Sequence, residues 1–201
     1  MSGSPLVDHE IRDAHLHHEL LIDPWTDSHL KMASYELTLS YHFKVFDTTS
    51  VTYINPTESQ DLMKDVYLSA PGAFFVLHPG EFALGASVES LYFSRTMAGQ
   101  INGKSSLGRR GLQVHATAGW FDPGFRGKAT LELSCVAPVP IRLHPGMIIA
   151  QMVFFRTAEC GVPYDQHPGS HYLDQSGPVE GAKVSWSNRS NGPMTETALA
   201  G

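Results

Sequence analysis

The stretch YELTLSYHFKV, residues 35–45, alternates apolar and polar side chains without interruption. Alternation with a period of two puts the two kinds of side chain on opposite faces of an extended chain, as in a half-buried β-strand. The apolar face of this stretch carries Tyr35, Leu37, Leu39, Tyr41, Phe43 and Val45. The stretch therefore predicts a strand with one face in a hydrophobic core.

The rest of the chain contains similar but shorter segments. Apolar runs predict further strands over residues 74–78, 82–93, 129–136, 141–143 and 148–155. Pro-Gly pairs, which favour tight turns, separate these runs at 79–80, 123–124 and 145–146. Many short strands joined by turns indicate a mainly β fold of the barrel or double-sheet type.

Two segments depart from the strand pattern. Ser4 and Pro5 are typical of a helix start and predict a short N-terminal helix over residues 7–21. Residues 55–72 carry turn residues at both ends and have weak periodicity, which indicates a long connection with at most one short strand.

Composition and charge limit the function classes. The 201 residues are 42% hydrophobic, enough for one sizeable core, and 14 Lys and Arg against 20 Asp and Glu give a net charge of -6. A chain with this balance has no broad basic surface for a nucleic acid. Cys135 and Cys160 cannot build a disulfide framework, the N-terminal sequence lacks a secretory pattern, and no apolar run is long enough to cross a membrane. We therefore expect a cytoplasmic protein with no nucleic-acid or membrane partner.

The C-terminal composition predicts a tail on a single domain. After Pro163 the chain is rich in Gly, Ser, His, Asn and Pro, and its last dozen residues have no hydrophobic pattern. We expect one domain over residues 1–188, in which residues 163–188 form a tail that a ligand or a neighbouring subunit orders. Residues 189–201 are predicted to be a flexible C-terminus.

The segment GKSSLGR, residues 103–109, combines a glycine, two hydroxyls and two cations. A backbone nest for phosphate oxygens needs these residue types. The segment is not a Walker loop, because it lacks a glycine five residues before Gly103. The alternative interpretation is a turn that leads into a capped helix.

Two carboxylates stand in patterns that allow either a functional or a structural role. In ATLELSCV, residues 129–136, alternation puts Glu132 on one face with Thr130 and Ser134. If that face lines a pocket, Glu132 can shuttle protons; if it meets bulk water, the glutamate is a surface charge. Asp122 comes just before a Pro-Gly turn among aromatic residues, where a turn-capping role and a functional role can coexist.

The histidines do not predict a zinc site. His15, His17, His18 and His115 invite a metal-ligand interpretation. The zinc nucleobase deaminases pair a His-x-Glu with a Cys-x-x-Cys, however, and Cys135 and Cys160 are too far apart to form one. We expect no catalytic zinc and no other metal bound by protein side chains.

Taken together, the motifs GKSSLGR (103–109), HATAGWFDPGFRG (115–127), TLELS (130–134) and PVPIRLHPGMIIAQ (138–151) resemble the dCTP deaminase family, a branch of the dUTPase-like superfamily. The likeness covers about residues 74–178. It implies a distorted β-barrel of the dUTPase-like type with a short N-terminal helix and a C-terminal tail. It also implies a homotrimer with active sites at the subunit interfaces, a Mg²⁺-bound nucleoside triphosphate as ligand and dTTP as a feedback inhibitor.

The resemblance assigns roles residue by residue. The cradle for the triphosphate would be Lys104, Ser105, Ser106, Leu107, Gly108 and Arg109, of which Ser105 and Arg109 reach the reacting centre. Asp122 would hold the deoxyribose 3′-hydroxyl, and the base would be read by Thr130, Leu131 and Glu132. The pocket would be completed by the backbone near Ala118, by Gln151, and by Tyr164, His171 and Gln175 from the tail. His171 stands where the family usually has lysine, so its phosphate contact would depend on pH near neutrality.

The chemistry implied by the resemblance is hydrolytic deamination of dCTP to dUTP and ammonia, with Glu132 as the general base. Bifunctional members of the family continue to dUMP and diphosphate, and the residues present permit that second step without proving it. One alternative is a pure dUTP diphosphatase, in which the residue at position 132 would be apolar. A second alternative is a nucleotide-binding barrel with no enzymatic activity.

Overall fold

The alternating and Pro-Gly-punctuated sequence folds into thirteen strands and a short N-terminal helix in the computed structural model, which describes residues 4–117 and 119–184. The helical elements are α1 (Asp8–Leu16), α2 (Ser105–Gly108) and the 3₁₀ turns at Asp27–His29 and Tyr164–Gln166. The strands are β1 (Leu20–Asp23), β2 (Leu30–Lys31), β3 (Ser34–Thr38), β4 (His42–Phe46), β5 (Met63–Tyr67), β6 (Phe75–Leu77), β7 (Phe82–Phe93), β8 (Met97–Gly103), β9 (Leu112–Gln113), β10 (Trp120–Phe121), β11 (Arg126–Cys135), β12 (Ile141–Leu143) and β13 (Ile148–Arg156).

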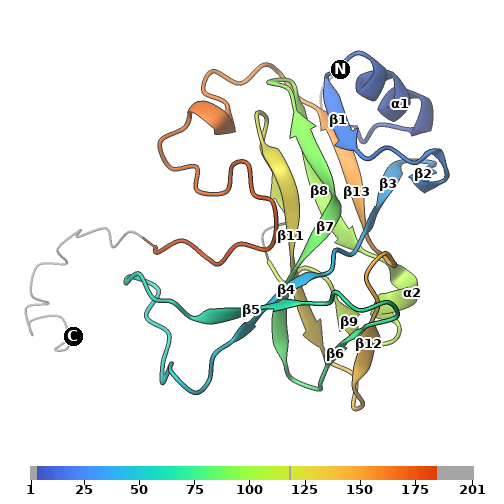
Figure 1. The fold of residues 1–201 in the computed structure, drawn as a ribbon. Helices are drawn as coiled ribbons and strands as arrows, with labels where there is room; N and C mark the ends of the chain where they lie inside the picture. The colour runs from blue at the N-terminus through green and yellow to red at the C-terminus, as the bar shows by residue number, and fades with distance from the viewer. Residues whose placement is uncertain (1–3, 118, 185–201) are drawn as a thin grey trace, which may run out of the picture.

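Two larger sheets and a two-stranded ribbon hold these strands. The first sheet has the order β5-β4-β7-β11-β9, with β1 also paired to β7. The second has the order β10-β8-β13-β3-β2, and β12 pairs with β6. One continuous hydrophobic cluster receives side chains from both larger sheets, including the fully buried Leu37, Phe93, Leu131 and Phe154. The mainly β class, with its short N-terminal helix, is confirmed (Figure 1).

The predicted N-terminal helix is too long at both ends. Helix α1 begins at Asp8, and the backbone N–H of Val7 donates to the Glu10 carboxylate at 3.0 Å. The helix ends at Leu16, because His18 adopts the left-handed conformation (φ 59°) and turns the chain away. Leu20, which continues the apolar spacing of the helix, is fully buried in β1 beside β7 instead.

The predicted strand over residues 35–45 is two strands. The chain leaves β3 in the second sheet, makes an isolated bridge from Leu39 to Ser87, and enters β4 in the first sheet. Tyr41, which alternation places on the apolar face, is 57% exposed at this crossing. Glu36, on the predicted polar face, is only 6% exposed because the side chains of Lys31 and Lys104 bond to it. Alternation identified the extended chain but not the change of sheet.

The remaining strand predictions hold with small shifts at the ends. β7 and β12 have the predicted bounds, and the connection over residues 55–72 contains one strand, β5. The sequence analysis predicts no strand at β8, where MAGQING lacks alternation. Gly99 is required there, because a Cβ atom would lie 2.7 Å from the Phe93 ring. Close packing against an aromatic ring therefore explains a residue type that is uncommon in strands.

The C-terminal tail follows β11 on its way toward β5 (Figure 1). Backbone hydrogen bonds fix its path: the N–H of Tyr164 donates to Pro123 O at 2.8 Å and that of Lys128 to Gln175 O at 2.9 Å. The N–H of Val184 donates to Pro56 O at 2.7 Å, in the connection between β4 and β5. The tail is thus ordered against its own domain up to residue 184, and the predicted boundary at residue 188 lies outside the described residues.

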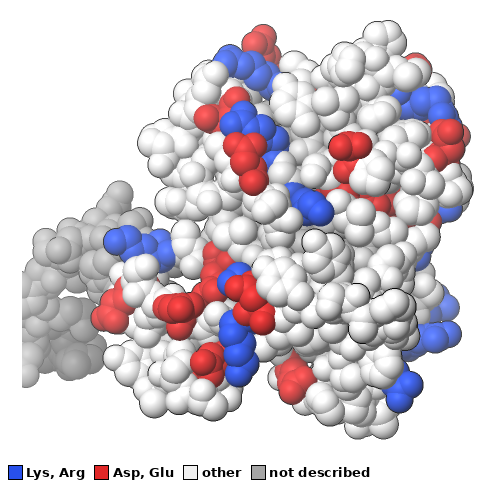
Figure 2. All heavy atoms as spheres, in the orientation of Figure 1, with Lys and Arg blue, Asp and Glu red and all other residues white. Residues whose placement is uncertain are grey.

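Acidic and basic side chains are intermixed on the face that Figure 2 draws, so this face is neither uniformly positive nor uniformly negative. This pattern agrees with the small net charge of -6. In the part of the chain that the structure describes, no helix combines the length and the apolar character needed to span a bilayer.

Candidate functional site

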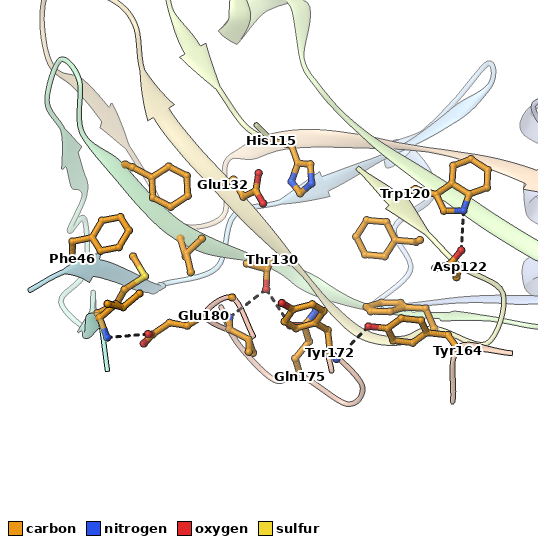
Figure 3. A pocket seen from close by; sticks show the side chains of 18 residues that line it. Phe46, His115, Trp120, Asp122, Thr130, Glu132, Tyr164, Tyr172, Gln175 and Glu180 are labelled. Atoms are coloured by element: carbon orange, nitrogen blue, oxygen red, sulfur yellow. Dashed lines mark hydrogen bonds between the residues drawn. The ribbon is translucent and has the colours of Figure 1, made fainter. Parts of the chain in front are cut away.

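A cavity of about 410 Å³ lies between the first sheet and the tail. Five residues predicted from the sequence line it, namely Asp122, Thr130, Glu132, Tyr164 and Gln175. Figure 3 shows Asp122 and Tyr164 at one end, Glu132 and Thr130 in the middle, and Phe46 and Glu180 at the other end. The volume is in the range of small-molecule sites.

Glu132 projects into this cavity from the middle of β11. Its neighbours Leu131 and Leu133 are fully buried on the opposite face, so the predicted alternation is confirmed. Glu132 Oε2 accepts the backbone N–H groups of Ala116 at 2.9 Å and Thr117 at 3.2 Å. These two bonds fix the rotation of the carboxylate and, within the described part of the chain, leave Oε1 for a ligand. Of the two interpretations that the sequence left open for the face carrying Glu132, the one in which it lines a pocket is correct.

His115 stands beside Glu132 in the cavity wall (Figure 3). Both of its ring nitrogens are buried, and neither has a hydrogen-bond partner among residues 4–117 and 119–184. Unpaired buried polar atoms are uncommon and point to a ligand or a water molecule. The sequence analysis considered His115 only as a metal ligand. In the described ranges, no three His, Cys, Asp or Glu side chains converge as a metal site would require.

Asp122 and Tyr164 form the other end of the cavity. The backbone oxygen of Asp122 closes the Pro-Gly turn by accepting Phe125 N–H at 3.1 Å, while its carboxylate Oδ1 accepts the indole N–H of Trp120 at 3.1 Å. Within the described residues the exposed carboxylate therefore caps no turn amide, and it lines the cavity. Burial raises the pKa of the Tyr164 hydroxyl, which accepts the N–H of Tyr172 at 3.2 Å. Aromatic side chains beside a carboxylate in the cavity wall suit a sugar ring and its hydroxyl.

Thr130 and Gln175 connect the sheet to the tail. The Thr130 hydroxyl donates to Gln175 Oε1 at 3.1 Å and accepts Val179 N–H at 3.3 Å. The predicted tail residue His171 is exposed and lies outside the cavity wall. The side chain of Leu131 is buried in the core, so only its backbone can face a ligand.

Gly127 allows the tail to lie this close to β11. Its φ is 130°, and a Cβ atom there would lie 2.9 Å from the backbone nitrogen of Gln175. We expect Gly127→Ala to push Gln175 away and to raise about tenfold the KM for the nucleoside triphosphate that the resemblance implies, which costs about 1.4 kcal/mol of binding. Steady-state kinetics would measure this, with Gly161→Ala as the control, because Gly161 has open space around it and lies outside the cavity wall. An unchanged KM in Gly127→Ala would contradict the role given to Gln175.

A second cavity, of about 400 Å³, lies beside α2. It is lined by the predicted residues Lys104, Ser105, Gly108 and Gln151. Of the other residues predicted for phosphate, Ser106 and Arg109 are exposed, and Leu107 packs against the hydrophobic core. The predicted turn into a short helix is therefore present, and it is compatible with phosphate binding. Ala118 lies outside the described residues.

Lys104 is held in this cavity by Glu36. The two side chains form an ion pair, and Lys31 Nζ lies 3.2 Å from the other oxygen of the same carboxylate. Burial of Glu36 acts to raise its pKa, but the hydrogen bonds from Lys104 and Lys31 outweigh burial and hold the pKa below its usual value. A charged Glu36 therefore keeps the Lys104 ammonium near the cavity.

The predicted site residues thus form two groups within one chain. The two cavities share His115. One group, on β11, the turn after β10 and the tail, suits a base and a sugar, whereas the other, around α2, suits phosphate.

Comparisons with known proteins show the family of this chain. The family model described as dCTP deaminase-like matches residues 5–157. A protein of Bifidobacterium animalis subsp. lactis (strain AD011) named "dCTP deaminase, dUMP-forming" is 43% identical over 176 residues, which cover 87% of this chain and 91% of that protein. A protein of Mycobacterium sp. (strain KMS) with the same name is 45% identical, and the match covers 87% of this chain and 93% of that protein.

One solved structure shares the fold. The crystal structure of 2′-deoxycytidine 5′-triphosphate deaminase from Agrobacterium tumefaciens has a TM-score of 0.60 to this chain at 22% sequence identity. The match covers 78% of this chain and 49% of that protein, so the chain spans about half the length of that solved protein.

Proposed function

This chain belongs to the dCTP deaminase-like family, and we propose that it hydrolyses dCTP, first to dUTP and ammonia and then to dUMP and diphosphate. The observation that carries the first step is the Glu132 carboxylate, half-buried in the cavity and fixed by two backbone amides. A dUTP diphosphatase has no C4 chemistry to catalyse and no need for a carboxylate at this place. A carboxylate that acts as a general acid or base must be held in a fixed position of this kind.

The deamination uses Glu132 twice. Its carboxylate takes a proton from water, and the resulting hydroxide attacks C4 of the cytosine. The carboxylic acid gives this proton to N3, and the regenerated carboxylate then takes the proton of the new C4 hydroxyl and passes it to the amino group. The C4–N4 bond breaks, C4=O forms and ammonia leaves. Because Ala116 and Thr117 hold Oε2, the other oxygen can carry the proton without a change of rotamer. General acid–base catalysis of this kind contributes about 10²- to 10⁴-fold in rate.

The phosphate-binding half of each site comes from a neighbouring protomer of a homotrimer. The separation of the predicted residues into two cavities that have only His115 in common supports this arrangement. Exposed Ser106 and Arg109 are then available to a nucleotide bound to the adjacent protomer. Arg109 and Lys104 would offset the charge of the triphosphate.

Two kinds of support favour continuation to dUMP. Curated relatives at 43% and 45% identity carry the name "dCTP deaminase, dUMP-forming". Attack of water on the α-phosphorus also needs a carboxylate to orient the water and a cation to take up charge, and Asp122 and Arg109 supply these groups.

Mg²⁺ would enter with the nucleotide and neutralise phosphate charge in this step. Hard phosphate oxygens suit this ion, whereas the Lys104 and Arg109 side chains suit the phosphate oxygens that the ion leaves free. The tail residues Tyr164 and Gln175 would close over the sugar and base, and dTTP would bind the same site as an inhibitor.

Incubation of the protein with dCTP and Mg²⁺ tests the proposal. We expect release of one ammonia and one diphosphate per dCTP, with dUMP as the nucleotide product on ion-exchange chromatography. Accumulation of dUTP without dUMP would remove the second step. Hydrolysis of added dUTP without ammonia release from dCTP would identify a diphosphatase, and binding without any product would identify a non-enzymatic barrel.

A further inference from the structure

Glu180 is the last side-chain anchor of the described tail. Its Oε1 accepts a hydrogen bond from Lys44 Nζ on β4 at 3.2 Å, and its Oε2 accepts the backbone N–H of Leu62, just before β5, at 3.3 Å. The two partners are 136 and 118 residues away in sequence. Glu180 also lines the cavity that contains Glu132, together with Val179 and Gly181 (Figure 3).

This ion pair is shielded from solvent more than most surface pairs. The side chain of Lys44 is 18% exposed and that of Glu180 is 21% exposed. Asp65 lies 3.4 Å from Lys44 Nζ and is itself hydrogen-bonded to His42 at 2.6 Å. Burial acts to lower the pKa of Lys44, but Glu180 and Asp65 outweigh burial and raise it, so the ammonium stays charged. Removal of one partner from such a pair costs more free energy than removal from an exposed pair, because the remaining charge is left partly buried and uncompensated.

Residues 176–181, here called the strap, cross the cavity between two anchors. At the first anchor, Gln175 is fixed to β11 through the N–H of Lys128. At the second, Glu180 is fixed to β4 and to the residue before β5. Between them, Val179 N–H donates to Thr130 Oγ1, and Gly177 lies so close to His42 that a Cβ atom would be 2.5 Å from His42 Nδ1. Without the second anchor, the C-terminal side of the strap is held only through two backbone hydrogen bonds further along the described tail, from Ala182 N–H to the Tyr172 hydroxyl and from Val184 N–H to Pro56 O.

We propose that Glu180 is a positioning residue that latches the strap across the cavity and thereby sets the affinity for the nucleotide. This inference rests on the proposed function for its kinetic part, because the strap crosses that same cavity beside Thr130. Glu180 acts through the strap, which keeps Gln175 and Val179 in contact with Thr130. It takes no part in proton transfer at C4.

The test compares Glu180→Gln with the parent protein in two measurements. In the nucleotide-free protein, we expect backbone amide hydrogen exchange over residues 176–182 to become at least tenfold faster. In kinetics with dCTP, we expect KM to rise about tenfold while kcat changes less than twofold. Lys44→Met removes the same ion pair from the other side and should give the same pattern, and the double variant should be no worse than either single variant.

Glu58→Gln is the matched control. Glu58 is an exposed carboxylate in the same β4–β5 connection, so the substitution makes the same change in net charge without touching the strap. Unchanged exchange over residues 176–182 in Glu180→Gln would overturn the latch. Faster exchange with an unchanged KM would overturn its role in affinity. Failure of the parent protein to release ammonia from dCTP would instead overturn the proposed function, while the exchange measurement would still test the latch.

Discussion

Glu132→Gln is expected to lower ammonia release from dCTP by about 10³-fold or more, while the protein still binds dCTP. The amide keeps the size of the side chain, and its oxygen can still accept the N–H groups of Ala116 and Thr117. The loop before β10 therefore keeps its anchor. The variant cannot take a proton from water, so the loss should appear in kcat and leave KM within a few-fold of the parent value.

The measurement combines an ammonia assay with equilibrium binding of dCTP to the variant. Glu159→Gln is a suitable control, because Glu159 is exposed and lies outside the wall of the cavity. Release of ammonia by Glu132→Gln at a rate near that of the parent would rule out the carboxylate as the base. Loss of dCTP binding together with activity would show that the carboxylate binds the cytosine ring and does not transfer a proton.

The strands were predictable where one segment stays in one sheet. β7 and β12 have the predicted bounds because their apolar runs are bounded by turn residues and each pairs within a single sheet. The prediction of a single strand over residues 35–45 was wrong, because alternation does not indicate the point at which the chain leaves one sheet for another. The helix prediction failed at Leu20 for a related reason, since apolar spacing cannot distinguish the last turn of a helix from a buried strand.

The sequence also predicted only some of the residues of the candidate site. The alternation around Glu132 and the family motifs indicated the residues on β11 and in the turn after β10. Glu180 was missed, because its partners Lys44 and Leu62 are more than a hundred residues away and only the fold brings them together. His115 was present in a quoted motif, but its unpaired ring nitrogens depend on burial, which the sequence does not report.

Truncation after Pro163 is expected to lower kcat/KM for dCTP by roughly 100-fold, which corresponds to the loss of about three contacts worth about 1 kcal/mol each. The deletion removes Tyr164 and Gln175 from the wall of the cavity, and it removes the strap that crosses the cavity beside Thr130. The sheets should remain folded, because the hydrophobic cluster is built from residues before the tail and Tyr164 only packs against it. The β11 backbone groups that the tail leaves behind become accessible to water, which can satisfy them.

Truncation after Asn188 is the control that separates the tail from the length of the chain. It keeps every contact described for residues 164–184 and also tests the domain boundary predicted from the sequence, so kcat/KM should stay within threefold of the parent value. Thermal unfolding and size-exclusion chromatography of both truncated proteins would establish that each keeps the fold and the oligomeric state. If truncation after Pro163 left kcat/KM unchanged, Tyr164, Gln175 and the strap would be bystanders. If both truncations lowered it equally, the critical residues would lie after Asn188, because the tail contacts described here persist in the longer protein.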